Sequence, residues 1–573
     1  MTRSFLSRRR SVRTDASASL ESDIVATLSP SNTLPHGSSI PDLDEDVMET
    51  ICAFTEDIHD LLSVSLACST MWRIAIRQLL RTQTIRLNSR KVICGFREFI
   101  LNQKPTRAQH IRSLAILHDA WSPGHRLFHL NDMGDQLMDI LDCAVNLDTL
   151  DLSLDNFEFN RADRYARLSS AIASMRALRH LSLSDPYLLG TIIVLNALSS
   201  PPVTICIRST TIFPVPFLIP PPSPLKIATA LDRFQSTPSV LTSLHFDFIS
   251  LNEDTFALPQ IRSVRSVFVS EVRGGPRLDV LLHLFPNLDG TLRLRLTPQE
   301  RFRLFDNELR LAQIRDDNRR TQEVHHWARL DMLDCEAMTA FAFALQCPVR
   351  RLTISRFDSR VLADMRPQHL VVTSIRLPQD LTLINDCTRT PSLCAGSQAS
   401  HVVLVLAHEA QDHRAENVDF MPRRSENVVF KSAVQALAFF PHVTHARLVF
   451  ECYKDHPFRD ELDEYDLVHQ MRECASISPD GRILAACPSL RCLVVTAAGR
   501  DESQAGIPSH GGWFATRAWR VVEGNDRQRT TGRAEPASRR LEELSDYAAR
   551  SIIEAEDLGL PDELEQNLAS YGM

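Results

Sequence analysis

The residues of this chain that come nearest to a known reaction motif are histidines beside acidic side chains. His408 and Glu409 are followed by His413, which gives the residue types of the zinc-binding HExxH motif with one residue too many. Two helical histidines reach one ion from the same face when they are four positions apart, and here they are five apart. The adjacent His325 and His326 diverge, so we interpret them as surface or hydrogen-bonded core histidines. Neither group predicts a metal site.

Other motifs of reaction chemistry are absent from the sequence. There is no Gly-rich dinucleotide or phosphate motif and no GxSxG nucleophile elbow, and only 18 glycines occur among 573 residues. The 13 cysteines are scattered singly with no CxxC pair, which is typical of free thiols in a reducing compartment. The sequence therefore predicts no catalytic residue, no metal ligand and no cofactor. An enzyme whose site assembles from distant residues is the third-ranked hypothesis.

Composition and charge narrow the class of partner. Hydrophobic residues make up 44% and charged residues 23% of the chain, as in ordinary globular proteins. The formal net charge of -8 is spread along the chain without a basic block, which argues against nucleic acid as the main partner. No apolar run reaches the ~18 residues of a membrane span. We therefore expect neither nucleic acid nor a membrane as a partner, and a location in the cytoplasm, the nucleus or both.

Residues 1–39 form a basic segment rich in Ser, Arg and Thr. Because such a composition cannot bury enough apolar surface to fold, a disordered tail is predicted. The run Arg8, Arg9 and Arg10, with few acidic residues before or after it, leaves a mitochondrial transit peptide as the alternative.

Residues 40–82 have the pattern of two or three short helices. Spacings of four and three put Val47, Ile51 and Phe54 on one helix face, behind an acidic start at 44–46. Asp60 is predicted to cap a second helix. The apolar residues that follow this cap are Leu61, Leu62, Leu66, Trp72 and Ile76. A unit of this size has too small a core to be stable by itself, so its spare apolar face predicts a binding partner.

This segment resembles the F-box, the module that docks a substrate receptor onto the Skp-type adaptor of a cullin–RING ubiquitin ligase. The residues that carry the resemblance are Leu43, Glu45, Asp46, Val47, Ile51, Asp60, Leu61, Leu62, Leu66, Cys68, Trp72 and Arg73. Asp44 stands at the place of the usual proline, and Trp72 follows Cys68 by four positions where three are usual. The resemblance implies a site for the adaptor, and through it for a cullin, made of Leu43, Val47, Ile51, Leu61, Leu62, Leu66 and Trp72.

Residues 83–500 repeat a helical stretch, a break and a short strand with the pattern Leu-x-x-Leu-x-Leu. Triplets of this kind begin at Ile111, Leu147, Leu178, Leu241, Val349 and Leu490. Pro286, Pro441 and Pro488 lie between helical stretch and strand, where a proline ends a helix and favours extended backbone. This order resembles leucine-rich repeats. It predicts an α/β fold, an irregular solenoid with parallel strands on the concave side and helices outside, with an ordinary α/β domain as the alternative.

Three further segments differ from the repeats. Prolines make residues 208–226 a stiff exposed loop, with an SH3- or WW-type ligand as the alternative. The mixed charges of residues 301–329 predict a solvated helix without a binding role. Residues 501–573 are predicted to form a cap for the last repeat and a charged tail, with a helix over 537–556.

Polar residues that alternate with the strand leucines are predicted to face outward on the concave side and to choose a protein target. The candidates are His180, His245, Arg293, Arg295 and Arg351. Plain solvent exposure is the alternative for each of them.

The leading hypothesis from these patterns is the substrate-recognition subunit of an F-box-dependent cullin–RING ubiquitin ligase. Such a subunit binds the Skp-type adaptor and an unidentified protein target and needs no catalytic residue of its own. The second hypothesis is a leucine-rich-repeat interaction scaffold not linked to ubiquitin, with residues 40–82 as a cap. The two differ in whether the face bearing Val47, Leu61 and Leu66 is exposed or folded back on the first repeat.

Overall fold

The computed structural model describes most of the chain between Asp44 and Tyr571. The described ranges are 44–55, 57–101, 106–117, 131–154, 162–185, 189–208, 224–232, 240–251, 259–305, 307–356, 358–376, 398–409, 428–453, 469–474, 481–500, 512–523 and 539–571. Residues 1–39, Leu43, residues 209–223 of the Pro-rich loop and His413 lie outside the described residues. The chain divides into two compact units, residues 1–247 and 248–573.

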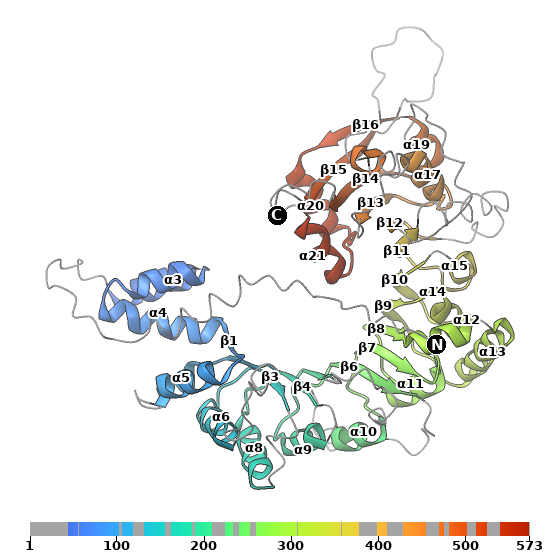
Figure 1. The fold of residues 1–573 in the computed structure, drawn as a ribbon. Coiled ribbons are helices and arrows are strands. Elements are labelled where there is room, and N and C mark those ends of the chain that lie inside the picture. Colours follow the sequence, from blue (N-terminus) through green and yellow to red (C-terminus); the bar gives the residue numbers. More distant parts are fainter. Residues whose placement is uncertain are drawn as a thin grey trace, which may run out of the picture. The chain divides into compact units, whose positions relative to one another are not determined.

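Each unit combines helices with strands, and the sixteen strands that the structure describes pair mostly in parallel, in the order in which they follow one another along the chain (Figure 1). This arrangement confirms the predicted α/β class with parallel strands. None of the helices that the structure describes is long and apolar enough to cross a membrane.

The described part of the first unit begins with three short helices, which we call the helical module: α2 (Glu45–Phe54), α3 (Ile58–Ser65) and α4 (Ser69–Thr82). The carboxylate of Asp57 caps α3 by accepting the backbone N–H groups of His59 and Asp60, at 2.7 Å and 3.2 Å. The prediction that Asp60 is this cap was therefore wrong, because α3 begins two residues earlier and Asp60 lies in its first turn. Asp44 caps α2, with the acidic residues after it in the first turn as predicted.

A small apolar core holds the helical module together. Its buried members are Cys52, Leu61, Ile74 and Ala75, and Met48, Val64 and Leu79 pack against them. Each of the three helices contributes to this set, because the spacing of three and four residues brings apolar side chains to one inner stripe.

The rest of the first unit alternates strands and helices, and the helices lie along one side of the strands (Figure 1). The elements are β1 (Thr84–Leu87), α5 (Arg90–Leu101), η1 (Ala108–His110), β2 (Ser113–Ile116), α6 (Asn131–Cys143), β3 (Thr149–Ser153), α8 (Ala162–Ser174), β4 (His180–Ser184), α9 (Leu189–Ala197), β5 (Thr204–Arg208), α10 (Pro224–Asp232) and β6 (Ser243–Ser250). Pro224, which the sequence assigned to the Pro-rich loop, is the first residue of α10. A proline is well suited to that position because the first helical N–H has no partner within the helix.

The apolar residues of neighbouring strands stand in register. In the first unit, the fully buried middle leucines Leu114 and Leu150 are partners, and Leu150 pairs in turn with Leu181. The same row continues through Ile205 to Leu244. Apolar residues from strands 24 to 39 residues apart in the chain therefore build one continuous buried row.

The second unit has the same alternation and then changes its pairing at the end. Its elements are β7 (Ser266–Arg273), α11 (Leu278–Leu284), β8 (Thr291–Leu296), α12 (Pro298–Phe305), α13 (Glu308–Val324), β9 (Leu330–Cys335), α14 (Ala337–Phe343), β10 (Val349–Ile354), α15 (Ser359–Met365), β11 (His369–Arg376), β12 (His401–Glu409), α17 (Val428–Leu437), β13 (His445–Tyr453), α19 (Gly481–Ala486), β14 (Cys492–Arg500), β15 (Gly512–Glu523), β16 (Arg539–Leu544), α20 (Asp546–Ala555) and α21 (Asp562–Ser570). The strands from β7 to β14 pair in parallel, whereas β15 and β16 are antiparallel. Pro286, Pro441 and Pro488 lie between helix and strand as predicted.

The helix predicted over residues 537–556 is wrong in its first half. Residues 539–544 form β16, which pairs with β15, and Ser545 then caps α20. The cap explains the boundary, because the Ser545 hydroxyl accepts the backbone N–H of Ala548 at 3.3 Å.

Candidate functional site

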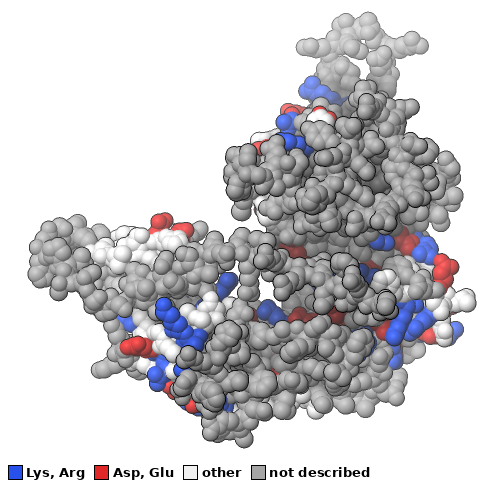
Figure 2. All heavy atoms as spheres, viewed as in Figure 1, with Lys and Arg blue, Asp and Glu red and all other residues white. Residues whose placement is uncertain are grey.

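The helical module leaves one apolar face exposed. Val47, Ile51 and Phe54 of α2 are 45%, 40% and 82% exposed, and Leu66, the residue that ends α3, is 60% exposed. Leu62 is half-buried, and Leu61 lies inside the core of the module. Figure 2 shows part of the module as uncharged surface with acidic side chains beside it. Of the residues proposed for the adaptor, Val47, Ile51 and Leu66 are thus exposed, and Leu61 supports the fold.

Trp72 of α4 contacts a different part of the first unit. The Arg107 guanidinium, just before η1, lies 4.6 Å from the centre of the Trp72 ring and 4.2 Å from that of Phe99. Such stacking of a cation on aromatic rings is worth about 0.5–2 kcal/mol. The half-buried Trp72 therefore joins α4 to the segment that precedes β2.

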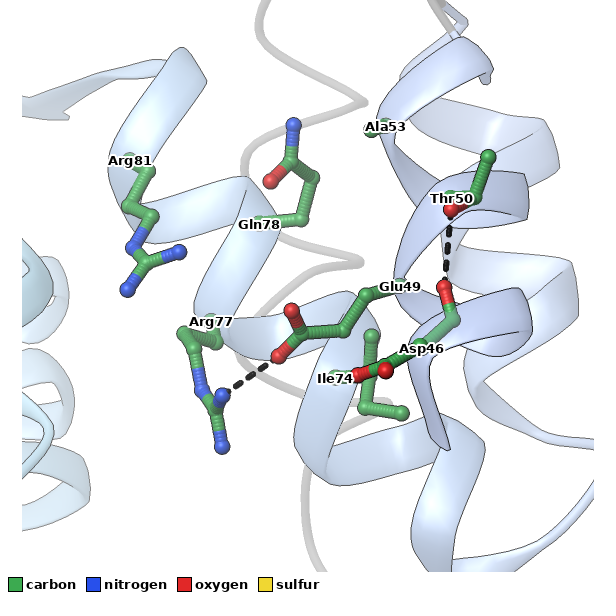
Figure 3. A pocket seen from close by; sticks show the side chains of 8 residues that line it. All are labelled: Asp46, Glu49, Thr50, Ala53, Ile74, Arg77, Gln78 and Arg81. Atoms are coloured by element: carbon green, nitrogen blue, oxygen red, sulfur yellow. Dashed lines mark hydrogen bonds and ion pairs between the residues drawn. The ribbon is translucent and has the colours of Figure 1, made fainter. Parts of the chain in front are cut away.

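A polar groove lies between α2 and α4 (Figure 3). It has a volume of about 410 Å³ and is lined by Asp46, Glu49, Thr50, Ala53, Ile74, Arg77, Gln78 and Arg81. Glu49 and Arg77 form an ion pair across it at 2.6 Å, and the Thr50 hydroxyl donates to the carbonyl of Asp46 at 2.8 Å. The groove thus contains paired charges and no nucleophile beside a base, and it offers no arrangement for acid–base or covalent chemistry.

In the second unit, residues 545–571 pack against a face of the sheet. We call this stretch, which includes α20 and α21, the C-terminal segment. Its Ala549, Leu558, Leu560 and Leu568 share one buried cluster with strand residues. Those strand residues are Val371, Val403, Val405, Val449, Cys492, Val494, Ala498 and Ala518. Because side chains alternate along a strand, this face is opposite to the one that bears Leu404 and Leu448, and Figure 1 shows α17 and α19 on that other side.

Acidic side chains of the C-terminal segment meet arginines of the sheet. Asp557 accepts from Arg350 at 2.8 Å and also binds Arg351, which donates in addition to the Gly559 carbonyl. Glu565 pairs with the buried Arg447. Because the Arg351 and Arg447 side chains are buried, the charge-assisted pairs that they form are partly shielded from water.

The pKa values of the acidic groups reflect these contacts. Burial raises the pKa of Glu565, but the hydrogen bonds and charge of Arg447 outweigh it and bring the pKa below its ordinary value. The hydrogen bond from Arg350 lowers the pKa of Asp331 in the same way. Both groups are therefore carboxylates at neutral pH.

Three histidines form a row under the C-terminal segment. His369, His401 and His445 are the first residues of β11, β12 and β13 and are partners in register. The rings of His369 and His401 stack at 4.1 Å, those of His401 and His445 at 4.8 Å, and both pairs are within 9° of parallel. Such a row follows from parallel strands in register, which lie about 4.8 Å apart.

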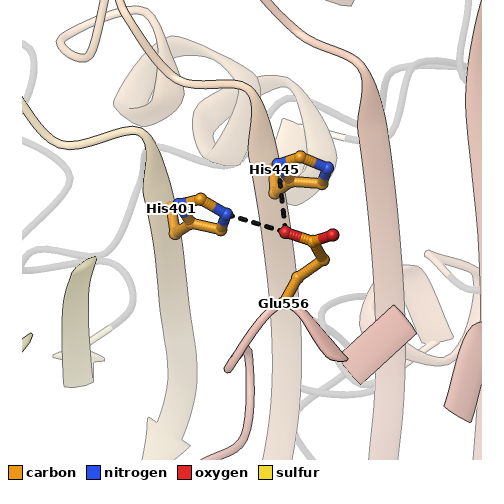
Figure 4. Close-up of side chains that lie close together, drawn as sticks. All are labelled: His401, His445 and Glu556. Atoms are coloured by element: carbon orange, nitrogen blue, oxygen red, sulfur yellow. Dashed lines mark hydrogen bonds and ion pairs between the residues drawn. The ribbon is translucent and has the colours of Figure 1, made fainter. Parts of the chain in front are cut away.

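Glu556 points its carboxylate at two of these histidines (Figure 4). Its Oε2 lies 3.1 Å from His401 Nε2 and 3.9 Å from His445 Nδ1. Burial, followed by the charge of His401, lowers the pKa of His369 to about 4, and burial also lowers the pKa of His445. Hydrogen bonding to His401 lowers the pKa of Glu556. A carboxylate thus faces two half-buried imidazoles, and burial favours the neutral form of His445.

The residues proposed for target recognition have different surroundings in each unit. In the first unit, His180 is exposed on β4, whereas His245 of β6 is half-buried with its Nε2 3.0 Å from the Ser243 hydroxyl. In the second unit, Arg293 pairs with Asp334 at 2.6 Å, and the exposed Arg295 lies 3.9 Å from Glu563. That these residues contact a target stays a prediction.

Arg351, also proposed for target recognition, is buried beneath the C-terminal segment. The sequence analysis missed the groups that meet there: the histidine row, Glu556, Asp557, Glu565 and Arg447. One signal was present in the sequence, because His369, His401 and His445 each come directly before a run of mostly apolar residues.

A search of protein-family models and of curated proteins finds no match to this chain. The geometry of these sites therefore carries the functional argument alone.

Proposed function

We propose that this chain is the substrate-recognition subunit of an F-box-dependent cullin–RING ubiquitin ligase. The helical module binds the Skp-type adaptor, and the sheet-and-helix repeats hold a protein target. The observation that supports the proposal is the exposed apolar face made by Val47, Ile51, Phe54 and Leu66. Contiguous exposed apolar side chains mark interaction surfaces, because leaving them in water is unfavourable.

The packing inside the helical module supports the same assignment. Leu61, Ile74 and Cys52 already fill its core, so the exposed side chains are surplus to the fold of the module. Each side chain of this size that a partner covers adds roughly 1.5–3 kcal/mol. Three or four of them are enough for a stable docking surface once ordering costs are subtracted.

In this proposal the chain acts by position. An adaptor on the module and a target on the repeats are held within one assembly, which raises the effective concentration of the target near the ligase. No catalytic side chain in this chain is required, in line with the paired charges in the groove between α2 and α4.

The second candidate function is an interaction scaffold not linked to ubiquitin, in which the helical module closes the end of the repeats. The stacking of Arg107 on Trp72 favours it, because the contact fastens α4 to the neighbouring strand-and-helix region as a cap requires. The same contact is expected if the helical module both closes the end of the repeats and binds the adaptor. Binding of the adaptor is therefore the deciding measurement.

The test uses the full chain and a purified Skp-type adaptor in calorimetry. The variant Ile51→Asp/Leu66→Asp places two charges on the exposed face and spares the module core. Leu309→Asp/Val324→Asp is the matched control, since these residues are 85% and 74% exposed on α13. We expect binding in the micromolar range or tighter for the wild type and the control, and a loss of about a hundredfold, or about 2.7 kcal/mol, in the first variant. Absence of binding by the wild type would rule out the receptor and leave the scaffold.

A further inference from the structure

The row of histidines and Glu556 bring together nitrogen and carboxylate donors at one place in the second unit. Among the described residues, His401, His445 and Glu556 each offer a donor atom, and these atoms all lie within 4.8 Å of one another. The side chains of His401 and His445 are only 12% and 18% exposed. The parallel pairing of β12 and β13 fixes the two histidines side by side, so the donors are positioned by the fold.

The charges around Glu556 differ from those around Asp557 and Glu565, two other acidic groups of the C-terminal segment. Asp557 is paired with Arg350 and Arg351, and Glu565 is paired with Arg447. Among the described residues, no arginine or lysine lies within 4 Å of Glu556, whose nearby basic groups are His401 and His445. This half-buried carboxylate therefore lacks the permanent cation that its neighbours in the segment have.

A second observation points to the same place. The Nδ1 of His369, which is stacked on His401, is buried and has no hydrogen-bond partner. It lies 3.9 Å from Asp557, beyond hydrogen-bonding distance. A buried polar nitrogen without a partner is unusual in a folded protein, and this one belongs to the ring that stacks on His401.

We propose that His401, His445 and Glu556 bind one Zn²⁺ ion, which fastens the C-terminal segment to β12 and β13. Two imidazoles and one carboxylate form a donor set that is typical of zinc. Calcium and magnesium favour oxygen ligands instead. The ion supplies the positively charged partner that Glu556 does not have among the described arginines and lysines. This site is independent of adaptor binding, and the sequence, which contains no local metal motif, does not predict it.

An ion fits after side-chain movements that include release of the Thr444 hydroxyl, which lies 3.0 Å from His445 Nδ1. Donors at about 2.1 Å from a tetrahedral zinc ion are about 3.4 Å apart, and the present separations of Glu556 Oε2 from the two histidine nitrogens are 3.1 Å and 3.9 Å. The Ser400 hydroxyl, 2.8 Å from His401 Nδ1, orients that ring as outer partners of metal-binding histidines do. Glu556 is 39% exposed, so water can supply the fourth ligand.

Zinc at this place links parts of the chain that are far apart in sequence. Glu556 follows α20 immediately, whereas His401 and His445 belong to the sheet. The ion therefore adds a bond at the turn between α20 and α21 and opposes release of the whole segment. Zinc that binds only while the C-terminal segment is packed on the sheet stabilises this packed state. The gain in stability grows with the logarithm of the ratio of the zinc concentration to Kd.

The experiment uses the full chain after treatment with EDTA and titration with Zn²⁺ alone in calorimetry. Glu556→Gln and His401→Phe remove one donor each while they keep the size of the side chain or the ring stack. The control is His325→Ala/His326→Ala, which removes two exposed histidines elsewhere in the second unit. We expect one zinc ion per chain, at least about tenfold weaker binding in each donor variant, and no change in the control.

Two further measurements separate the proposed site from other zinc binding. Co²⁺ in place of Zn²⁺ should give visible bands without the near-ultraviolet charge-transfer band of thiolate ligands, which distinguishes these donors from the 13 cysteines. Trypsin cleavage after Arg550, the single basic residue of the C-terminal segment, should slow several-fold with zinc in the wild type and not in Glu556→Gln. Thermal melts show whether each variant is folded. No zinc binding by the wild type, or equal binding by a folded Glu556→Gln variant, would overturn the proposal.

Discussion

The helical module and the sheet face beneath the C-terminal segment are both rich in apolar side chains, but only the first is exposed. Phe54 of the module is 82% exposed, whereas Val403 and Val449 of the sheet are covered by Leu558 and Leu560 from the same chain. The exposed side chains of the module are therefore the surface that our proposal assigns to a partner from another protein. The sheet face already has an internal partner, complete with charge pairs.

This difference changes what target recognition requires in the second unit. A protein that binds to the face under the C-terminal segment must compete with contacts from Asp557 and Glu565, or bind beside them. The arginines of this face select acidic groups, as the segment itself shows. An external ligand that displaces the C-terminal segment must therefore bind this face more strongly than the segment does.

The largest effect is expected from reversing the buried charge at the centre of the internal contact. The Arg447 side chain is 2% exposed, and it pairs with Glu565 and donates to the Leu558 carbonyl at 3.1 Å. Arg447→Glu places two carboxylates together and should cost about 3–5 kcal/mol, measured by urea unfolding. It should also speed trypsin cleavage after Arg550.

The exchange Arg447→Glu/Glu565→Arg is the matched control for this prediction. If the pair holds the segment, the double variant recovers part of the lost stability, because opposite charges face each other again. A single variant with wild-type stability and wild-type cleavage would show that the segment is held by its apolar contacts alone.

A pair of alanine substitutions compares the covered and the exposed surface directly. Leu558→Ala removes a fully buried side chain from the sheet face and should lower the free energy of unfolding by about 2–4 kcal/mol. Phe54→Ala removes a larger side chain from the exposed face and should change it by less than about 0.5 kcal/mol. Urea midpoints measure both.

A larger loss of stability in Phe54→Ala than in Leu558→Ala would contradict this comparison of the covered and the exposed surface. A strong loss of stability in Phe54→Ala would mean that part of the chain covers α2 in solution. The exposed face would then no longer support docking of an adaptor.

Local pattern was enough to predict part of the alternation of helices and parallel strands, although β5, β9, β11 and β12 were not among the predicted strands. The Leu-x-x-Leu-x-Leu spacing alternates buried and outward positions, and Leu150 and Leu181 consequently lie in one buried row. Pro286 and Pro441 ended helices before strands, since a proline blocks helix continuation whatever surrounds it. These features depend on residues that are close together in the sequence, so the sequence alone can reveal them.

The internal contact of the C-terminal segment could not be predicted in that way. Arg350 and Asp557 are 207 residues apart, and no periodicity joins them. The acidic residues at the end of the chain have the composition of a solvated tail. Only the folded sheet, which aligns Arg350 and Arg351 with the turn after α20, gives them a partner.

Buried amides were a second feature that the sequence did not reveal. The mixed charges of residues 301–329 predicted a solvated helix, and α13 is exposed over most of its length, but its Asn318 and Gln322 are buried. Asn318 donates to the carbonyls of Pro276 and Ala342, both at 2.9 Å, and Gln322 to that of Phe343 at 3.1 Å. The pattern of apolar residues cannot reveal this buried helix face, because its buried groups are side-chain amides. They donate hydrogen bonds to backbone carbonyls.

The smallest of these effects concerns the pH dependence of the internal contact. The folded-state pKa of Glu565 lies below its ordinary value of 4.5 because the Arg447 pair outweighs burial. The pair therefore stabilises the fold fully above about pH 4.5, and this contribution is lost as the pH falls through the folded-state pKa. Since the Glu565 side chain is 35% exposed, water screens the pair and the contribution should be no more than about 1 kcal/mol.

The variant Glu565→Gln isolates this contribution from that of Asp331, whose pKa is also lowered and which both proteins retain. Urea unfolding at pH 6 should show the wild type as the more stable protein, and the difference should shrink toward pH 3 as the wild-type carboxylate gains a proton. On the exposed face of the helical module no such pair is buried, so adaptor binding should not follow the same titration. A stability difference that is constant from pH 6 to pH 3 would mean that Glu565 contributes by packing, and the covered and exposed surfaces would then differ in apolar contact alone.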